Sequence, residues 1–157
     1  MLEIIKEPNP ILKQISEPVK LPLSKEDKAL LDEMYNWLKE HSEEAIGLAA
    51  VQFGYLKRMC VIKIKDGGVT HSYKLVNPKI VRHSERYTFI PEGCLSVPEV
   101  IDTPVKRWDS VTVIGFDAIT NRNVTIVARG GLLTRCLQHE IDHMDGIEFT
   151  QRLKKGE

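Results

Sequence analysis

The sequence has no long apolar segment. No run of about 18 apolar residues occurs anywhere in the chain, so a membrane-spanning helix is not expected. The first residues, Met1–Lys6, contain neither the apolar stretch of a secretory signal peptide nor the arginine-rich pattern of a transit peptide. We therefore expect a cytoplasmic protein. Its 157 residues, 42% of them hydrophobic and 28% charged, predict a single soluble domain over residues 1–157 with a sizeable core.

The sequence also lacks an excess of charge of either sign. Its 22 Lys and Arg residues balance its 22 Asp and Glu residues. A general nucleic-acid-binding protein would carry a basic surface, and a polybasic membrane anchor would carry a cluster of cations. Neither DNA nor a membrane is therefore an expected partner.

Cysteine is scarce, with only Cys60, Cys94 and Cys136. An odd, small number without a signal peptide does not form a disulfide framework. Each thiol is therefore an apolar core residue, a metal ligand or a reactive group. Cys60 lies in the mostly apolar run Met59–Ile64 and is interpreted as core.

The periodicity of apolar residues predicts an α+β fold. A short helix is expected over Ile11–Ile15 and a longer one from Ser24 to about His41–Glu44, and Ala45–Gly54 is interpreted as a loop. The closing helix is expected over about Leu132–Asp145, ended by Gly146. Short strands are expected at Met59–Ile64, His71–Val76, Lys79–His83, Arg86–Ile90, Val100–Trp108, Val111–Phe116 and Asn123–Ala128. The expected architecture is short antiparallel β-strands packed around the C-terminal helix, plus an N-terminal helix.

The most informative motif is Gln138–His143, which contains H-E-x-x-H within the closing helix. Residues four apart share one face of a helix, so His139 and His143 can offer two imidazoles to one metal ion. Glu140 lies about 100° around the helix, close enough to handle protons at a metal-bound water. Both histidines continue an apolar stripe through Cys136, a position that also suits hydrogen-bonded core histidines. The pair with Glu140 between them favours a metal hydrolase.

The third ligand decides which hydrolase this is. A thermolysin-like site needs a Glu well downstream, but only 14 residues follow His143. A metzincin needs a third His at position 149, which is Phe149. Cys94 lies between Gly93 and Pro98, where a packing role explains a cysteine poorly, although a small buried apolar residue is the alternative. As a thiolate, Cys94 would complete a Cys-His-His site with one open position.

The sequence resembles the peptide deformylases. That family carries three motifs in order, G-x-G-x-A-A-x-Q, E-G-C-L-S and Q-H-E-x-D-H. This chain has Ala45–Gln52 (AIGLAAVQ), Glu92–Ser96 (EGCLS) and Gln138–His143 (QHEIDH). Two departures stand out: Ala45 replaces the first Gly, and the chain stops without the basic C-terminal extension of many members. If position 45 needed a positive φ, Ala would cost roughly 1 kcal/mol or more; if Gly only gave room, the methyl group would narrow the cleft.

The resemblance implies removal of the formyl group from N-terminal formyl-methionine of new polypeptides, with release of formate. It implies Cys94, His139 and His143 as ligands of one divalent metal ion. Water activated by that metal attacks the formyl carbon, while Glu140 acts as general base and then general acid. The implied donors to the developing oxyanion are the Gln52 side-chain amide and the Leu95 backbone N–H.

The resemblance also implies a binding pocket and a metal. Its substrate-binding positions are Ile46, Gly47, Ile90, Glu92, Gly93, Leu132 and Cys136, with Gly47 allowing the substrate backbone to pair as an added strand. A thiolate ligand suits both zinc and iron. The family implies Fe²⁺ in the cell, and Zn²⁺, Ni²⁺ or Co²⁺ could occupy the site in a purified sample.

The expected partners are N-formylmethionyl peptides and nascent chains. Transient proximity to the ribosome is expected without a basic C-terminal extension, in a bacterial or phage-infected bacterial cell, and the chain is expected to be a monomer. Two alternatives compete with this interpretation. A metal-dependent peptidase acting on internal bonds is disfavoured by Phe149 and the short tail, and a non-catalytic metal-stabilised binding module is disfavoured by the presence of Glu140.

Overall fold

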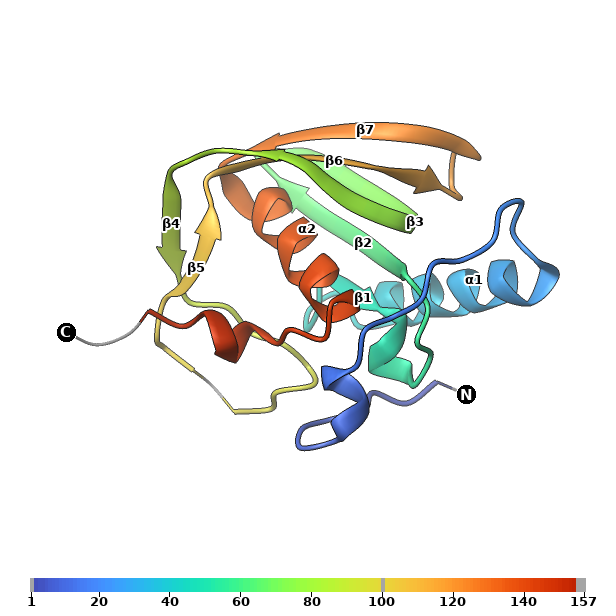
Figure 1. The fold of residues 1–157 in the computed structure, drawn as a ribbon, viewed down its shortest axis with the longest axis horizontal. Helices are drawn as coiled ribbons and strands as arrows, with labels where there is room; N and C mark the ends of the chain where they lie inside the picture. The colour runs from blue at the N-terminus through green and yellow to red at the C-terminus, as the bar shows by residue number, and fades with distance from the viewer. Residues whose placement is uncertain (1, 100, 155–157) are drawn as a thin grey trace.

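The computed structural model describes residues 2–99 and 101–154. Within them, one sheet has five strands in the order β1-β2-β3-β6-β7, and every neighbouring pair is antiparallel. A second sheet pairs β4 with β5. The strands are β1 (Gly47–Ala49), β2 (Met59–Asp66), β3 (Val69–His83), β4 (Tyr87–Ile90), β5 (Val105–Trp108), β6 (Ser110–Asp117) and β7 (Arg122–Arg129). Both sheets curve over helix α2 (Gly131–Met144), as Figure 1 shows.

Helix α1 (Lys25–Glu40) forms the second layer against β2. It begins where the Ser24 hydroxyl accepts a hydrogen bond of 3.0 Å from the Asp27 backbone N–H, which satisfies one free donor of the first turn. Residues three and four apart then place one apolar stripe on the sheet. That stripe is fully or nearly fully buried, and it consists of Leu30, Leu31, Met34 and Leu38.

Helix α2 is buried along almost its whole length. Gly130 precedes it and offers no side chain for capping, so the Asp66 carboxylate at the end of β2 accepts the Leu132 N–H at 2.9 Å instead. Gly146 follows the helix with φ of 73°, the left-handed conformation that ends many helices. The apolar side of α2 packs on the inner face of the sheet with Leu133, Leu137, Ile141 and Met144.

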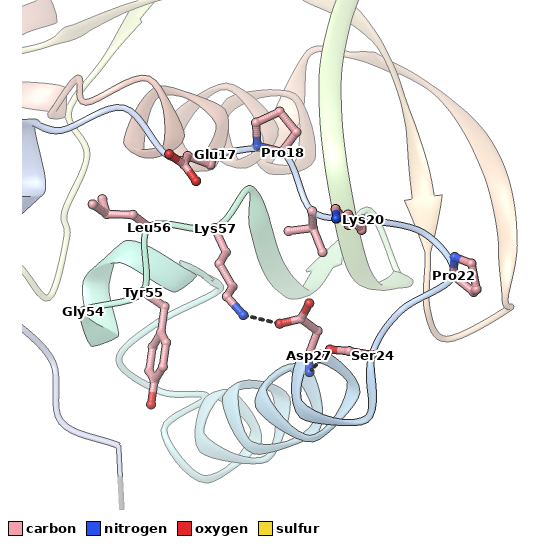
Figure 2. Close-up of a pocket in the computed structure, with 11 residues that line it drawn as sticks. Glu17, Pro18, Lys20, Pro22, Ser24, Asp27, Gly54, Tyr55, Leu56 and Lys57 are labelled. Carbon is pink, nitrogen blue, oxygen red and sulfur yellow. Dashed lines mark hydrogen bonds and ion pairs between the residues drawn. The ribbon is translucent and has the colours of Figure 1, made fainter.

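The N-terminal segment crosses in front of α1 before that helix begins (Figure 1). Asn77 holds it to β3, because its side chain accepts from the Val19 N–H and donates to the Val19 carbonyl, both at 2.8 Å. A cavity of about 590 Å³ remains between this segment and α1, and Lys57 reaches across it to form an ion pair with Asp27 (Figure 2). None of the predicted site residues lines this cavity.

The structure confirms the predicted α+β class and the antiparallel strands around the C-terminal helix. Several predicted bounds were wrong. The two strands expected at 71–76 and 79–83 form the single strand β3, because the irregularity at Asn77 (φ 53°) and Pro78 shifts its register without ending it. The strand expected from residue 100 begins only at Val105, after Pro104; residue 100 itself lies outside the described residues.

Two further bounds differ from expectation. The helix expected at 11–15 is the 3₁₀ turn η1 (Pro10–Lys13), and a later turn η3 (Phe149–Arg152) was not predicted. The loop expected at 45–54 contains β1 and the 3₁₀ turn η2 (Ala50–Phe53). Three residues are too few for alternation to show in the sequence. Across residues 2–99 and 101–154, no helix is both long and apolar enough to cross a membrane.

Replacing Gly146 with Ala should destabilise the fold. A Cβ there would lie 2.5 Å from the Lys13 carbonyl oxygen, and φ is 73°. The left-handed backbone and the overlap together should lower the free energy of unfolding by about 3 kcal/mol. Gly67→Ala is the control, because Gly67 has φ of 61° and no atom within 4 Å of the added Cβ. Its expected loss is about 1 kcal/mol. Urea unfolding of both variants compares them, and equal losses would contradict the packing argument.

Candidate metal centre and active site

Three potential metal ligands lie together beside the C-terminal half of α2. Cys94 comes from the loop between β4 and β5, and His139 and His143 come from one face of the helix. The Cys94 Sγ lies 3.4 Å from the His143 Nε2, which lies 3.2 Å from the His139 Nε2. A tetrahedral ion with ordinary bond lengths places such ligand atoms about 3.3–3.6 Å apart. The three side chains therefore fit one metal ion in both spacing and chemistry.

Phe149 occupies the place where a metzincin would supply its third histidine. Its ring is buried and lies nearly parallel to the His139 ring, with the centroids 5.9 Å apart. An apolar ring cannot ligate a metal, and Phe149 instead packs against the His139 ring. Among the described residues, the group that could hold a metal ion consists of Cys94, His139 and His143.

The loop that carries Cys94 is held by hydrogen bonds on both sides. The Val97 N–H donates to the Cys94 carbonyl at 2.9 Å and closes a tight turn. The Ser96 hydroxyl donates to the Ile5 carbonyl at 2.6 Å, and the Glu7 N–H donates to the Ser96 carbonyl at 2.8 Å. The N-terminal segment thus fixes the backbone beside the cysteine.

A buried ionic network supports the histidines from behind. The Arg107 guanidinium donates to both Glu92 oxygens, at 3.0 and 2.8 Å, and forms an ion pair with Asp142. The Glu92 Oε1 lies 2.9 Å from the His139 Nδ1. Burial favours a higher Glu92 pKa, but the hydrogen bonds from His139 and Arg107 outweigh it and lower the pKa to about 2. Glu92 is therefore ionised and orients the His139 ring.

The electrostatics of the two histidines favour a cation. Burial lowers the pKa of His143 well below its usual value, and the neighbouring His139 and Arg107 charges lower it further. The His143 ring is therefore neutral, and one of its nitrogens has a lone pair that can bind a metal ion. Burial also opposes a charge on His139, but hydrogen bonds to Cys94 and Glu92 and the nearby Glu140 charge raise its pKa to about 10. The groups around His139 therefore attract a positive charge, which a metal ion would supply.

Glu140 is buried beside the ligands with one oxygen free. It is 3% exposed, and its Oε1 makes no hydrogen bond among the described residues. Burial raises its pKa to about 7, against the opposing effect of the His139 and Arg107 charges. A carboxylate with such a pKa can both accept and release a proton near neutrality.

Gln52 is oriented by its own turn. The Ala49 N–H donates to its Oε1 at 2.9 Å, so the side-chain amide nitrogen faces the opposite way. That nitrogen lies 3.2 Å from the Ser96 Oγ and 3.6 Å from the Cys94 Sγ. A fixed donor therefore points at the ligand cluster.

A cleft of about 620 Å³ opens above the cluster. Three of its apolar residues, Ile46, Ile90 and Leu132, are 37%, 51% and 49% exposed, the pattern of a binding surface rather than a core. Every predicted site residue except His143 lines it: Ile46, Gly47, Gln52, Ile90, Glu92, Gly93, Cys94, Leu95, Leu132, Cys136, His139 and Glu140. His143 lies buried beneath, in contact with Cys94 and His139.

Gly47 and Ala45 show how the loop shapes this cleft. A Cβ on Gly47 would lie 2.7 Å from both the Cys136 Sγ and the Glu140 Oε2, so only glycine fits. Ala45 is not among the residues with positive φ, and its methyl group packs against the core beneath α1. The backbone strain considered for Ala45 therefore does not arise, while narrowing of the cleft by its methyl group stays a prediction, since Ala45 is among the residues that line the cleft.

Sequence reasoning missed the residues that support the cluster. Glu92 forms ion pairs with Arg107 and Arg135, and Arg107 also pairs with Asp142 of α2. Ser96 contacts the Gln52 side chain. A single Arg in a strand gives no spacing signal, and its partners are far away in sequence. Asp142 lies inside the H-E-x-x-H motif, next to His143. A second acid at this position was the sequence signal that could have indicated a buried basic partner.

Comparisons with known proteins agree with this geometry. The family model described as polypeptide deformylase matches residues 1–157. Peptide deformylase 2 of Geobacillus stearothermophilus is 38% identical over 170 aligned residues, which cover 100% of this chain and 91% of the relative. The chain belongs to the peptide deformylase family. A crystal structure of peptide deformylase from Ehrlichia chaffeensis matches with a TM-score of 0.87 and 34% identity, over 99% of this chain and 89% of that one.

Another solved structure of the family describes the same Ehrlichia chaffeensis protein in complex with actinonin. It matches with a TM-score of 0.86 and 35% identity, over 99% of this chain and 90% of that one. The family relationship thus extends over the whole length on which the fold and the cleft were described.

Arg107→Met should destabilise the protein strongly. It would leave Glu92 and Asp142 without the buried cation between them, since the Arg107 side chain is 1% exposed. Removing one partner of such a pair costs about 3–5 kcal/mol. Arg152→Met is the matched control, because Arg152 also pairs with Asp142 but is 38% exposed; its expected cost is about 1 kcal/mol or less. Thermal and urea unfolding measure both, and similar losses would refute the burial argument.

Cys94→Ala should weaken metal binding if the thiolate is a ligand. We expect at least about 100-fold weaker binding of Zn²⁺ or Fe²⁺, because loss of a ligand exceeds the loss of a supporting hydrogen bond. Cys60→Ala is the control: it truncates a buried cysteine of β2 outside the cluster and should keep the metal. Elemental analysis and metal titration measure both variants. A folded Cys94→Ala protein with undiminished affinity would overturn the ligand assignment.

Proposed function

We propose that this chain removes the formyl group from the N-terminal formyl-methionine of new polypeptides and releases formate. The observation that carries the proposal is the position of Glu140, buried with a free oxygen beside the Cys94, His139 and His143 cluster, at the base of the cleft. Membership of the peptide deformylase family over residues 1–157 supports the same reaction. We also propose that residues 1–157 form one catalytic domain.

Cys94, His139 and His143 would hold one divalent metal ion, which we propose to be Fe²⁺ in the cell. A thiolate with two imidazoles suits iron and zinc alike, so Zn²⁺, Ni²⁺ or Co²⁺ could replace it after purification. When bound, such an ion supplies Lewis acidity toward water and the formyl carbonyl. Glu92 keeps His139 in the orientation needed for ligation through Nε2, since it holds the Nδ1.

Side-chain and backbone groups of this chain transfer the proton and stabilise the negative charge on the formyl oxygen. Glu140 accepts the proton of the attacking water at its free carboxylate oxygen and delivers it to the leaving amine. Negative charge develops on the formyl oxygen, and the Gln52 amide N–H groups donate to it together with the Leu95 backbone N–H. Gln52 is ready for this role because the Ala49 N–H already holds its carbonyl oxygen.

The methionine side chain would occupy the apolar part of the cleft formed by Ile46, Ile90, Leu132 and Cys136. Gly47 lets the substrate approach, because no side chain separates the loop from Glu140. Among the described strands, β1 pairs with β2 alone and forms an edge of the sheet, so the substrate backbone can add along its other side. Glu92 and Gly93 also line the cleft.

The partners follow from this reaction. N-formylmethionyl peptides and nascent chains are the substrates, so we propose transient proximity to the ribosome in the bacterial cytoplasm. We also propose that the chain acts as a monomer, since every proposed site residue lines or underlies one cleft of a single chain.

Glu140→Gln should lower kcat for formate release about 10²–10⁴-fold, because the amide cannot accept the water proton. The assay uses formyl-Met-Ala-Ala with protein loaded anaerobically with Fe²⁺, and metal content is measured in parallel. Glu148→Gln is the control, since Glu148 is equally buried but does not line the cleft; its kcat should stay close to that of the unmodified protein. Unchanged turnover in a fully metallated Glu140→Gln protein would overturn the assignment, and no formate from the unmodified protein would overturn the function.

A further inference from the structure

The second half of strand β2 is attached to two apolar residues of the cleft. The Lys63 N–H donates to the Ile46 carbonyl at 2.9 Å, and the Asp66 carboxylate accepts the Leu132 N–H at the same distance. Ile46 and Leu132 both line the cleft and are partly exposed. Two residues that are far apart in sequence are therefore held through their backbones by one short stretch of a single strand.

The attachment of Leu132 replaces a cap that helix α2 does not supply. Gly130 precedes the helix and has no side chain to accept the free N–H groups of the first turn. The Asp66 Oδ2 accepts from Leu132 and, at 3.4 Å, from Leu133. A Cβ on Gly131 would overlap this oxygen, so glycine at position 131 leaves the space that the carboxylate fills. The negative charge also suits the positive end of the helix dipole.

The first turn of α2 is the least buried part of that helix. Gly130, Gly131 and Leu132 are exposed, and continuous burial begins at Leu133. The Gly130 N–H donates to the Asp109 carbonyl, which fixes the chain before the turn but not the turn itself. Helix ends with few packed contacts fray readily. The position of the Leu132 side chain therefore depends on the hydrogen bonds from Asp66.

We propose that Asp66 is a positioning residue for the methionine pocket, because it caps α2 and thereby holds Leu132 where the substrate side chain binds. The inference rests on the proposed function and assigns a binding role to a residue that is not among those lining the cleft. Asp66 should act on binding rather than on chemistry. His139 and Glu140 follow Leu132 by about two helical turns and lie in the buried part of α2.

The expected effect is a change in KM without a matching change in kcat. Loss of an N-cap shifts the equilibrium between an ordered and a frayed first turn about fivefold. Affinity falls in proportion to the fraction of molecules that can bind. Asp66→Ala should therefore raise the KM for formyl-Met-Ala-Ala about two- to fivefold and leave kcat within about twofold. Asp66→Asn keeps an oxygen that can cap the helix, so its KM should stay close to that of the unmodified protein.

The experiment measures kcat and KM for formyl-Met-Ala-Ala with Fe²⁺-loaded protein, and calorimetric binding of the product peptide Met-Ala-Ala. The variants are Asp66→Ala, Asp66→Asn, Leu132→Ala and the double variant of Asp66→Ala with Leu132→Ala. Ser24→Ala is the matched control, because Ser24 caps α1 and is not among the residues lining the cleft. It should lower stability in urea to a similar extent and leave KM unchanged.

The double variant distinguishes positioning from a general loss of stability. Leu132→Ala should raise KM because it removes an apolar contact with the substrate. Asp66→Ala should add no further rise in that background, since the side chain that it positions is already absent. The inference is overturned by an unchanged KM in Asp66→Ala, by an equal rise in Ser24→Ala, or by effects of Asp66→Ala and Leu132→Ala that multiply in full.

Binding of Met-Ala-Ala separates the inference from the proposed function. If formate is released and Asp66→Ala has the KM of the unmodified protein, the positioning role alone fails. If Met-Ala-Ala binds but no formate is released, the proposed function fails, and weaker binding of the peptide to Asp66→Ala still supports the positioning role. If the unmodified protein does not bind Met-Ala-Ala, the inference is overturned, because there is then no methionine pocket for Asp66 to organise.

Discussion

The geometry of the site depends on one buried cation, Arg107. Its guanidinium joins Glu92 of the Cys94 loop to Asp142 of α2, two segments that are 50 residues apart in sequence but adjacent in the fold. A buried guanidinium can satisfy two carboxylates at once because its donors form a planar fork. Each carboxylate on its own would be costly to bury. The network therefore fixes the distance between the cysteine and the histidines, on which any shared metal ion depends.

The same network explains why a polar helix can form the centre of the fold. Gln138, His139, Glu140, Asp142 and His143 are all buried on α2, although buried polar groups are destabilising unless they are paired. Gln138 exchanges hydrogen bonds with the Trp108 backbone, and Asp142 pairs with Arg107. Among the described residues of α2, the Arg135 Nε, the Glu140 Oε1 and the His143 Nδ1 are buried without a hydrogen-bond partner. Arg135 and Glu140 line the cleft and His143 belongs to the cluster beneath it, so the unpaired polar atoms of this helix gather at the candidate site.

The sequence contained the local part of this arrangement. Four-residue spacing placed His139 and His143 on one face, and elimination of Phe149 as a ligand left Cys94, which the structure brings to 3.4 Å from His143. Long-range contacts were not readable. Arg107 has no pattern around it, β1 is only three residues long, and the capping of α2 by Asp66 joins two elements across the sheet. Periodicity reports which face a residue occupies, whereas these features depend on which partner lies opposite.

The base and the rim of the cleft are under different physical constraints. Around the cluster of Cys94, His139 and His143, Glu92 and Gln52 each have defined partners, and Gly47 has no room for a side chain, so substitution there would disturb several contacts together. Glu43, Glu44, Glu99 and Asp102 also line the cleft, but they are exposed and form no ion pairs among the described residues, so they can change with little effect on folding. Substitutions at the base of the cleft are therefore coupled to the stability of the fold, whereas substitutions of its exposed acidic residues are not.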